Sequence, residues 1–220
     1  MLTEIKLEQT ARGTRIISGD LAKKRRNIIN NCIKVAEANG FEEVVLPAIE
    51  MAEVYTDKAG PEILGQMYVF PDKKGRALCL RPEGTATCQL IAREKLKFEK
   101  NVCLWYVTSC WRYERPQEGR YREFTQFGVE ILNPTDGKLK IKSNAETFSG
   151  LLLDMATEMV KFCTNDFVVD SAAKRGLAYY VGDGFEISCP SLGAQKQVCG
   201  GGTYAEGIGF AIGIDRLMLL

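Results

Sequence analysis

The sequence predicts an α+β fold built on an antiparallel β-sheet flanked by helices. Two β-rich stretches, 102–111 and 123–132, enclose a short polar turn and therefore form a long antiparallel hairpin. Strand-like segments also outnumber helical ones along the chain, which disfavours a doubly wound α/β sheet. With 220 residues the chain is long enough for one substantial core, so we expect a single domain over residues 1–220.

The first long helix is expected over residues 20–39. Asp20 is a candidate N-cap, and Gly40 is a typical stop after the last helical residue. Its apolar stripe consists of Ile29, Cys32, Ile33 and Ala36. The basic run 23–26 lies in the first turns and is interpreted either as a solvated face or as a contact for a polyanion.

The segment between this helix and the hairpin predicts two short strands and a second helix. A buried strand is expected over 43–46, where Pro47 ends it. A further strand over 77–80 leads into a helix that continues to Lys97. In the hairpin strand 123–132, apolar and polar residues alternate, so one face of the hairpin is apolar and the other polar. The alternating sets are Phe127, Val129 and Ile131 against Gln126, Gly128 and Glu130.

The last third of the chain is expected to begin with an amphipathic helix. Residues 143–146, Ser-Asn-Ala-Glu, form a capping box. The apolar face that follows consists of Phe148, Leu151, Leu152, Met155 and Met159. Short strands are then expected over 167–169, 179–181 and 185–188. A turn at Gly200–Gly202 and an apolar helix over about 208–220 complete the prediction.

Composition excludes several classes of protein. The net charge is +1, so whole-protein charge supplies no signature of nucleic-acid binding. The eight cysteines include no CxxC pair and mostly occupy apolar runs, where a thiol behaves as a small hydrophobe. The N-terminus lacks the apolar stretch of a signal peptide, and no segment is long and apolar enough to span a bilayer. A reducing, cytoplasmic location without membrane contact is expected.

Histidine is absent from the sequence. Ser-His-Asp triads, HExxH zinc sites and histidine-based general-base catalysis are therefore excluded. Any catalysis has to use arginine, lysine, carboxylates, backbone groups or metal ions.

Three clusters of residues are candidates for chemistry. Arg112–Pro116 faces Arg120 and Arg122 across the turn, and several guanidinium groups on one hairpin suit phosphate binding, although a salt-bridged surface hairpin would look the same. Arg175 with Tyr179–Tyr180 is either a site or a cation–π packing feature. The glycines of 207–213 miss the spacing of the dinucleotide fingerprint, so Rossmann binding is rejected.

Five motifs in a fixed order resemble the catalytic core of class II aminoacyl-tRNA synthetases of the histidyl type. Residues 112–124 resemble motif 2, and 209–217 resemble motif 3. Residues 175–180 resemble the arginine-and-tyrosine motif of histidyl enzymes. The segments 80–85 and 12–15 also match the family, and Pro47 fits motif 1, which forms the dimer interface there. The resemblance implies the class II synthetase fold and a homodimer.

The same resemblance implies an ATP site. Arg112 would hold the α-phosphate and Arg216 the γ-phosphate, while Arg120 or Arg122 would reach the outer phosphates. Arg175 would lie beside the α-phosphate, so Arg112, Arg175 and Arg216 are the expected catalytic residues. The adenine would be held by two further residues of motif 2, Glu114 at its amino group and Phe124 under its ring.

An amino-acid site is implied next to the ATP site. Glu83 and Thr85 would receive the α-amino group and Gln126 the carboxylate region. The side chain, most simply that of histidine, would meet Glu130 and the tyrosines Tyr179, Tyr180 and Tyr204.

Adenylation agrees with a chain that has no histidine. The attacking carboxylate is already ionised at neutral pH and pyrophosphate leaves without a proton, so no general base is needed. Positioning and cationic stabilisation by arginines and Mg²⁺ are sufficient.

The sequence departs from the family at several points, so alternatives stay open. The insertion and anticodon-binding domains are not expected within these residues. Ala178, Thr203 and Ala205 replace an Asp, an Arg and an Asp that flank the family's amino-acid pocket. Three interpretations remain: a compact core that charges tRNA, a paralogous ligase with another acceptor, and a non-catalytic paralogue like the regulatory subunit of histidine biosynthesis.

Overall fold

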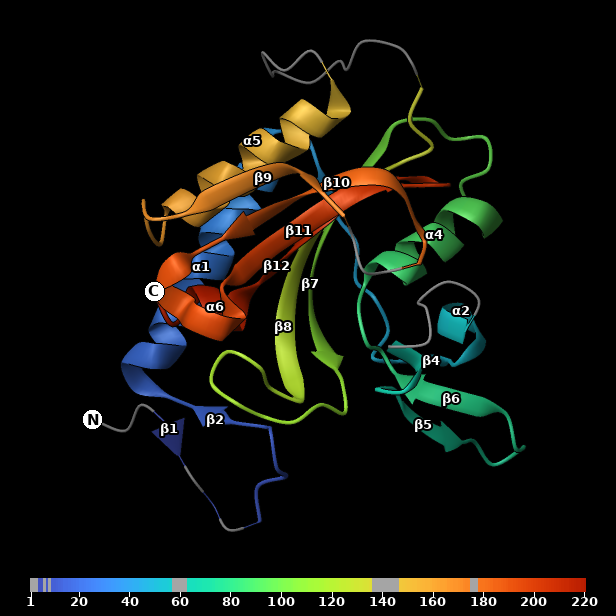
Figure 1. The fold of residues 1–220 in the computed structure, drawn as a ribbon. Helices are drawn as coiled ribbons and strands as arrows, with labels where there is room; N and C mark the ends of the chain where they lie inside the picture. Colours follow the sequence, from blue (N-terminus) through green and yellow to red (C-terminus); the bar gives the residue numbers. More distant parts are fainter. Residues whose placement is uncertain (1–3, 6, 8, 57–62, 136–146, 175–177) are drawn as a thin grey trace.

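The computed structural model describes residues 4–5, 7, 9–56, 63–135, 147–174 and 178–220, and within them the main element is a seven-stranded sheet. Its strands, in spatial order, are β3 (Glu42–Glu43), β7 (Val102–Trp111), β8 (Glu123–Leu132), β12 (Gly207–Gly213), β11 (Gln197–Tyr204), β10 (Tyr180–Ser188) and β9 (Val168–Ala173). β3 pairs with β7 in parallel, and every other pair is antiparallel (Figure 1). The expected α+β architecture is confirmed.

Two smaller sheets and two helices lie beside the main sheet. An antiparallel three-stranded sheet has the order β4 (Ile49–Met51), β6 (Ala77–Leu80), β5 (Tyr68–Pro71), and β1 (Glu4–Ile5) pairs with β2 (Ile16–Ile17). The short helix α2 (Glu53–Thr56) contacts α4 (Thr85–Glu94), which packs on β8.

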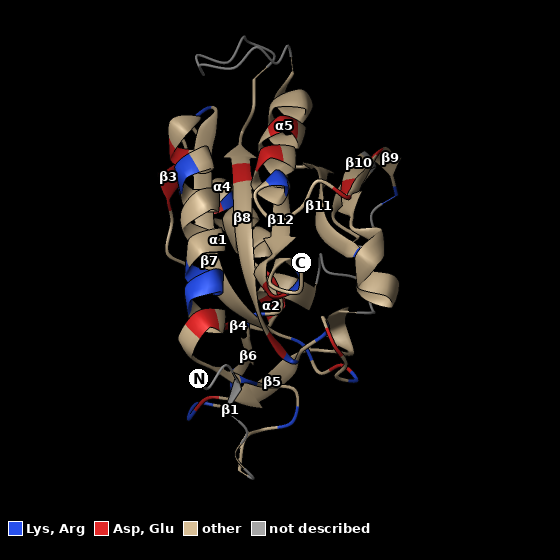
Figure 2. Cartoon of the chain, turned by 90° about the vertical axis from the view of Figure 1, so that its left-hand side faces the viewer, with Lys and Arg blue, Asp and Glu red and all other residues tan. Residues whose placement is uncertain are grey.

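The two longest helices cover one face of the main sheet. α1 (Gly19–Ala38) and α5 (Phe148–Lys161) stand side by side in front of it in Figure 2, and the short α6 (Ile214–Leu217) packs against α1 and β8. Between helices and sheet lies the largest core cluster, which includes Cys32, Phe127 and Leu152, all with no exposed surface. The opposite face carries α4 and a smaller cluster around Tyr106. None of the helices in the described ranges is long and apolar enough to cross a membrane.

The ends of α1 and α5 differ in part from the prediction. α1 begins one residue earlier than expected, because Ser18, with extended backbone, is the N-cap and Asp20 lies in the first turn. Gly40 follows the helix with φ 78°, which confirms it as the C-terminal stop. The predicted capping box at 143–146 lies outside the described residues. The N-cap of α5 is Thr147, whose hydroxyl accepts a hydrogen bond from the Gly150 amide at 3.1 Å.

The predicted hairpin is confirmed in both limits and faces. β7 and β8 pair along their whole lengths, from Val102 opposite Leu132 to Trp111 opposite Glu123. Phe127, Val129 and Ile131 lie in the helix-covered core, whereas the alternate residues of β8 face α4 and a cavity.

Several shorter elements were predicted with wrong limits. The strand expected at 43–46 is the two-residue β3, which is exposed because it lies at the edge of the sheet. The helix α4 ends at Glu94 rather than Lys97. The two strands expected at 179–181 and 185–188 are one strand, β10. Its pairing register with β11 shifts between Tyr180 and Gly184, so the strand continues through the segment between the two predicted strands.

The largest error concerns the glycine-rich C-terminal region. Gly200–Gly202 is part of strand β11 and not a turn, and the expected helix over 208–220 is strand β12 followed by the four-residue α6. β12 lies between β8 and β11, where its backbone pairs on both edges. At Gly209 a Cβ would overlap the Glu130 carboxylate and lie 2.6 Å from the Val129 carbonyl oxygen. The glycines therefore mark close strand approach rather than helix or turn.

We predict that Gly209→Ala destabilises the chain by about 1–3 kcal/mol, because the added methyl group displaces buried groups. Gly213→Ala is the matched control at the other end of β12, since a Cβ there meets its nearest neighbour at an ordinary 3.9 Å. It should change stability by less than about 1 kcal/mol. Urea unfolding of both variants measures the difference, and equal effects would contradict the close approach at Gly209.

Candidate functional site

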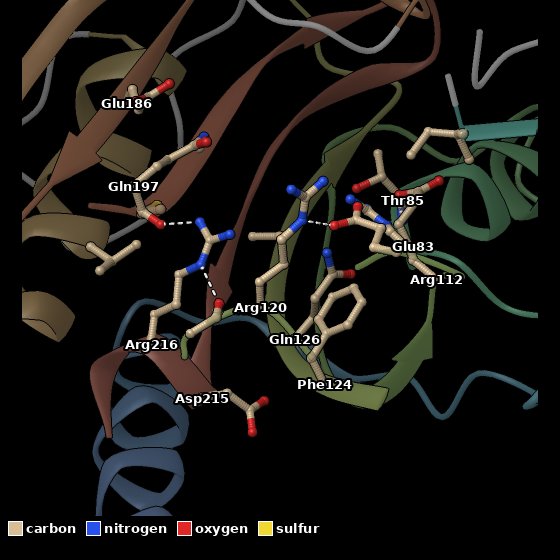
Figure 3. Close-up of a pocket in the computed structure, with 18 of the residues that line it drawn as sticks. Glu83, Thr85, Arg112, Arg120, Phe124, Gln126, Glu186, Gln197, Asp215 and Arg216 are labelled. Atoms are coloured by element: carbon tan, nitrogen blue, oxygen red, sulfur yellow. Dashed lines mark hydrogen bonds and ion pairs between the residues drawn. The ribbon is translucent and has the colours of Figure 1, made fainter. Parts of the chain in front are cut away.

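A cavity of about 370 Å³ opens on the polar face of the β7–β8 hairpin (Figure 3). Its walls come from segments far apart in sequence: the start of α4, the hairpin and its turn, β10, β11, and the junction of β12 with α6. Most of the predicted site residues line it, namely Glu83, Thr85, Arg112, Glu114, Arg120, Phe124, Gln126, Tyr179, Tyr180 and Arg216. The fold thus brings together residues predicted separately from four motifs.

Three arginines form one side of the cavity. Arg112 donates from Nε to the Pro82 carbonyl oxygen at 2.9 Å, and its Cζ lies 5.3 Å from the centre of the Phe124 ring. Arg120 forms an ion pair with Glu114. Arg216 donates to the carbonyl oxygens of Gly119, at 3.0 Å, and Gln197 (Figure 3). Backbone carbonyls therefore fix the position of two guanidinium groups without neutralising them.

The surroundings of Arg216 disfavour the positive charge of its guanidinium group. Burial lowers the pKa of its guanidinium, and the positive charges of Arg112 and Arg120 lower it further. Among the described residues no carboxylate forms a salt bridge with Arg216 or Arg112. An anionic ligand placed between these arginines would relieve their mutual repulsion, as phosphate groups do.

The opposite side of the cavity carries hydrogen-bonding groups at the start of α4. The Glu83 carboxylate accepts from the backbone amides of Thr85 and Ala86 at 2.7 and 2.9 Å. Gln126 accepts from the Gly84 amide at 3.3 Å. Burial raises the pKa of Glu83, although these amides oppose the shift. A ligand ammonium group would stabilise the ionised form of Glu83.

Glu130 lies directly behind this side and has no exposed surface. Its carboxylate accepts hydrogen bonds from Thr85 Oγ1 and Tyr204 Oη, both at 2.7 Å, and from Tyr106 Oη at 3.5 Å. Burial raises the pKa of Glu130 to about 8, against the lowering effect of these donors. Near neutral pH the carboxyl group is therefore able to exchange a proton with a titratable ligand group that reaches it.

Among the described residues, Arg122 and Tyr204 were predicted for the site but do not line the cavity. Arg122 donates to the Glu114 carbonyl oxygen at 3.0 Å, and its guanidinium stacks 3.9 Å from the centre of the Tyr113 ring. Tyr204 is buried behind the lining with Glu130. Arg175 falls outside the described residues.

Sequence reasoning missed several lining residues. Tyr121 and Asp215 stand inside motifs 2 and 3, so their position in the motifs was a signal that was not used. Glu186 and Gln197 come from β10 and β11, and no motif marks them. Gln66, Lys174 and Cys199 also contribute without a sequence signal. In the described part of the chain, no group of three or more acidic or cysteine side chains forms a metal site.

Comparison with known proteins decides the family. A family model described as histidyl-tRNA synthetase matches residues 13–157. The histidine–tRNA ligase of Archaeoglobus fulgidus is 31% identical over 303 residues, and the match covers 94% of this chain and 74% of the relative. The chain belongs to the histidyl-tRNA synthetase family. The motif resemblance is thereby confirmed.

Solved structures share the fold. The apo histidyl-tRNA synthetase of S. aureus superposes with a TM-score of 0.75 at 24% identity, covering 97% of this chain and 70% of that one. A Bacillus halodurans protein described as an ATP phosphoribosyltransferase regulatory subunit/histidyl-tRNA synthetase gives a TM-score of 0.75 at 16% identity, covering 98% and 83%. The expected class II synthetase fold is confirmed by the first of these structures.

We predict that Glu130→Gln makes stability less dependent on pH. In the folded chain the pKa of Glu130 is about 8, above the ordinary 4.5 of an unfolded chain, so folding retains a proton between these values. The resulting stability is complete below about pH 4.5 and is lost as the pH rises through 8, by up to about 1.4 kcal/mol per pH unit. Urea unfolding between pH 5 and 8 should show a smaller loss in the variant, and identical slopes would refute the shift.

Proposed function

We propose that the chain activates an amino acid with ATP to an aminoacyl-adenylate, with histidine as the substrate and tRNA as the acceptor. One observation carries this proposal. A single cavity joins an arginine-rich side, suited to phosphates, to a carboxylate-lined side, suited to an α-amino group. The relatives named histidine–tRNA ligase support histidine and tRNA as partners.

ATP would bind along the arginine side. Arg112 lies between Phe124 and the carbonyl of Pro82, where it would hold the α-phosphate while the Phe124 ring supports the adenine. Arg216 would hold the γ-phosphate. Glu114 pairs with Arg120, and ATP would exchange this pair for contacts of Arg120 with phosphate and of Glu114 with the adenine amino group.

The amino acid would bind on the other side of the cavity. Glu83 would accept its ammonium group, and Gln126 would contact its carboxylate region. An imidazole side chain would reach towards Thr85 and the buried Glu130, whose raised pKa matches a group that titrates near neutral pH. Tyr179 and Tyr180, whose rings pack 4.7 Å apart, would form the wall beside the side chain.

The proposed reaction needs no general base. A carboxylate oxygen of the amino acid attacks the α-phosphorus, the bond to the bridging oxygen breaks, and pyrophosphate leaves with the electron pair. Arg112 would stabilise the charge on the α-phosphate, together with Arg175 by family resemblance, and Arg216 would hold the leaving group. A chain without histidine supplies all of these roles.

Mg²⁺ is proposed as the metal that accompanies ATP. In nucleotide sites this ion is held by one or two carboxylates together with phosphate oxygens. Glu186 fits this pattern, because it lines the cavity and its negative charge acts on Arg216. One of its carboxylate oxygens accepts a hydrogen bond from Ser188 Oγ at 3.2 Å. When bound, the ion would neutralise charge on the leaving pyrophosphate.

A homodimer in the cytoplasm completes the proposal. The residues around Pro47 expose apolar surface, with Val45 85% and Ile49 51% exposed, which supports the motif 1 region as a dimer interface. All eight cysteines are free thiols, as in a reducing compartment.

We expect a dimer in sedimentation equilibrium and a shift to monomer for Val45→Asp; a monomeric wild-type chain would contradict the interface.

ATP–pyrophosphate exchange measured separately with each amino acid tests the proposal. We expect exchange with histidine above all others, followed by aminoacylation when tRNA is added. Exchange without tRNA charging would favour a ligase with another acceptor. No exchange with any amino acid would exclude adenylation and leave a non-catalytic paralogue.

Arg112→Ala should lower the exchange rate by about 100- to 1000-fold, because it removes a preorganised charge beside the α-phosphate. Arg76→Ala is the matched control: it breaks an exposed ion pair with Asp72 on β5–β6, outside the cavity. Near-normal exchange in the Arg112 variant would refute its role in the site.

A further inference from the structure

The N-terminal segment is attached to the turn that closes the cavity. The Gly13 carbonyl oxygen accepts a hydrogen bond from the Arg122 amide at 2.8 Å. Gly13 has φ 86°, and a Cβ there would lie 2.7 Å from the Arg122 side chain, so glycine permits this approach. In Figure 1 strands β1 and β2 lie at the same end of the molecule as the β7–β8 turn.

Arg15, two residues further on, joins two parts of the cavity lining. Its guanidinium lies 3.5 Å from the centre of the Tyr121 ring and forms an ion pair with Asp215. Both partners of the ion pair are largely buried, with side-chain exposures of 13% and 11%. Tyr121 belongs to the turn and Asp215 to the start of α6, and both line the cavity.

Asp215 is fully engaged by protein groups. One carboxylate oxygen binds Arg15, and the other accepts from the Thr125 amide at the start of β8 at 2.6 Å. Its neighbour Arg216 donates to the Gly119 carbonyl oxygen in the same turn. The turn is therefore held to α6 at two points, Gly119 through Arg216 and Tyr121 through Arg15.

We propose that Arg15 is a positioning residue for the nucleotide: it clamps Tyr121 against Asp215 and so fixes Arg120 and Arg216 relative to each other. This inference rests on the proposed function, because it assigns the clamp to the ATP side of that site. Arg15 itself does not line the cavity. Its effect is transmitted through the turn and through α6.

A role in positioning differs measurably from a role in stability alone. The clamp touches the arginine side of the cavity and none of Glu83, Thr85 or Gln126. Loss of the clamp should therefore weaken ATP binding selectively, whereas general destabilisation reduces the active fraction and leaves both KM values unchanged.

Steady-state exchange kinetics on the full chain test this assignment. Arg15→Met keeps much of the side-chain volume but removes the ion pair, and should raise KM for ATP by about 10- to 100-fold, as small misplacements of binding groups do. KM for the amino acid should stay within about twofold. Arg15→Lys retains the charge without the planar stacking on Tyr121, so it should give an intermediate KM for ATP and covers the case that Arg15→Met fails to fold.

Arg93→Met is the matched control, since it breaks the partly buried Arg93–Glu206 ion pair at the far end of α4, outside the cavity lining. It should leave both KM values unchanged. If the wild type is active and the Arg15 variants keep the wild-type KM for ATP, the positioning role of Arg15 is refuted. An equal rise in KM for ATP and KM for the amino acid refutes it as well. A wild-type chain that shows no exchange overturns the proposed function itself.

Discussion

The antiparallel pairing of β7 with β8 is the constraint on which the rest of the structure depends. Because side chains alternate along a strand, one hairpin supplies Phe127 and Val129 to the helix-covered core and Gln126 and Glu130 to the opposite side. A slip of one residue would exchange these faces. Core packing and the polar site therefore fix the same register, and the turn that joins the strands carries the arginines to the edge of the cavity.

The second constraint is close approach of backbone to buried polar groups. Glu130 has no exposed surface, and it lies there because three hydroxyl groups face its carboxylate and Gly209 leaves room beside it. Tyr106 likewise lies over Gly84 and Gly128, where a Cβ would collide with its ring. These glycines contribute to the site because the missing Cβ leaves room for neighbouring side chains. Gly13 has the same effect, because the missing Cβ lets the N-terminal segment approach Arg122 in the turn.

The sequence predicted the fold class, the limits of the hairpin and 10 of the 23 residues that line the cavity. These features depend on local patterns: alternation in 123–132 and arginines at fixed spacing. The prediction failed where the structure of a segment depends on partners that are distant in sequence. Residues 208–213 are apolar enough for a helix, but pairing with β8 and β11 makes them a strand. Glu186 lies in no motif, and Arg15 lies in a segment that matches the family but received no role from it. Only the folded chain brings Glu186 near Arg216 and Arg15 near Asp215.

We propose that one cavity holds both the nucleotide and the amino acid. Calorimetric titration with a non-hydrolysable sulfamoyl analogue of histidyl-adenylate tests it most directly. If the two sides form one site, the analogue binds far more tightly than ATP or histidine alone and displaces both, since its halves share one loss of translational freedom. Simultaneous, independent binding of ATP and the analogue would contradict the account.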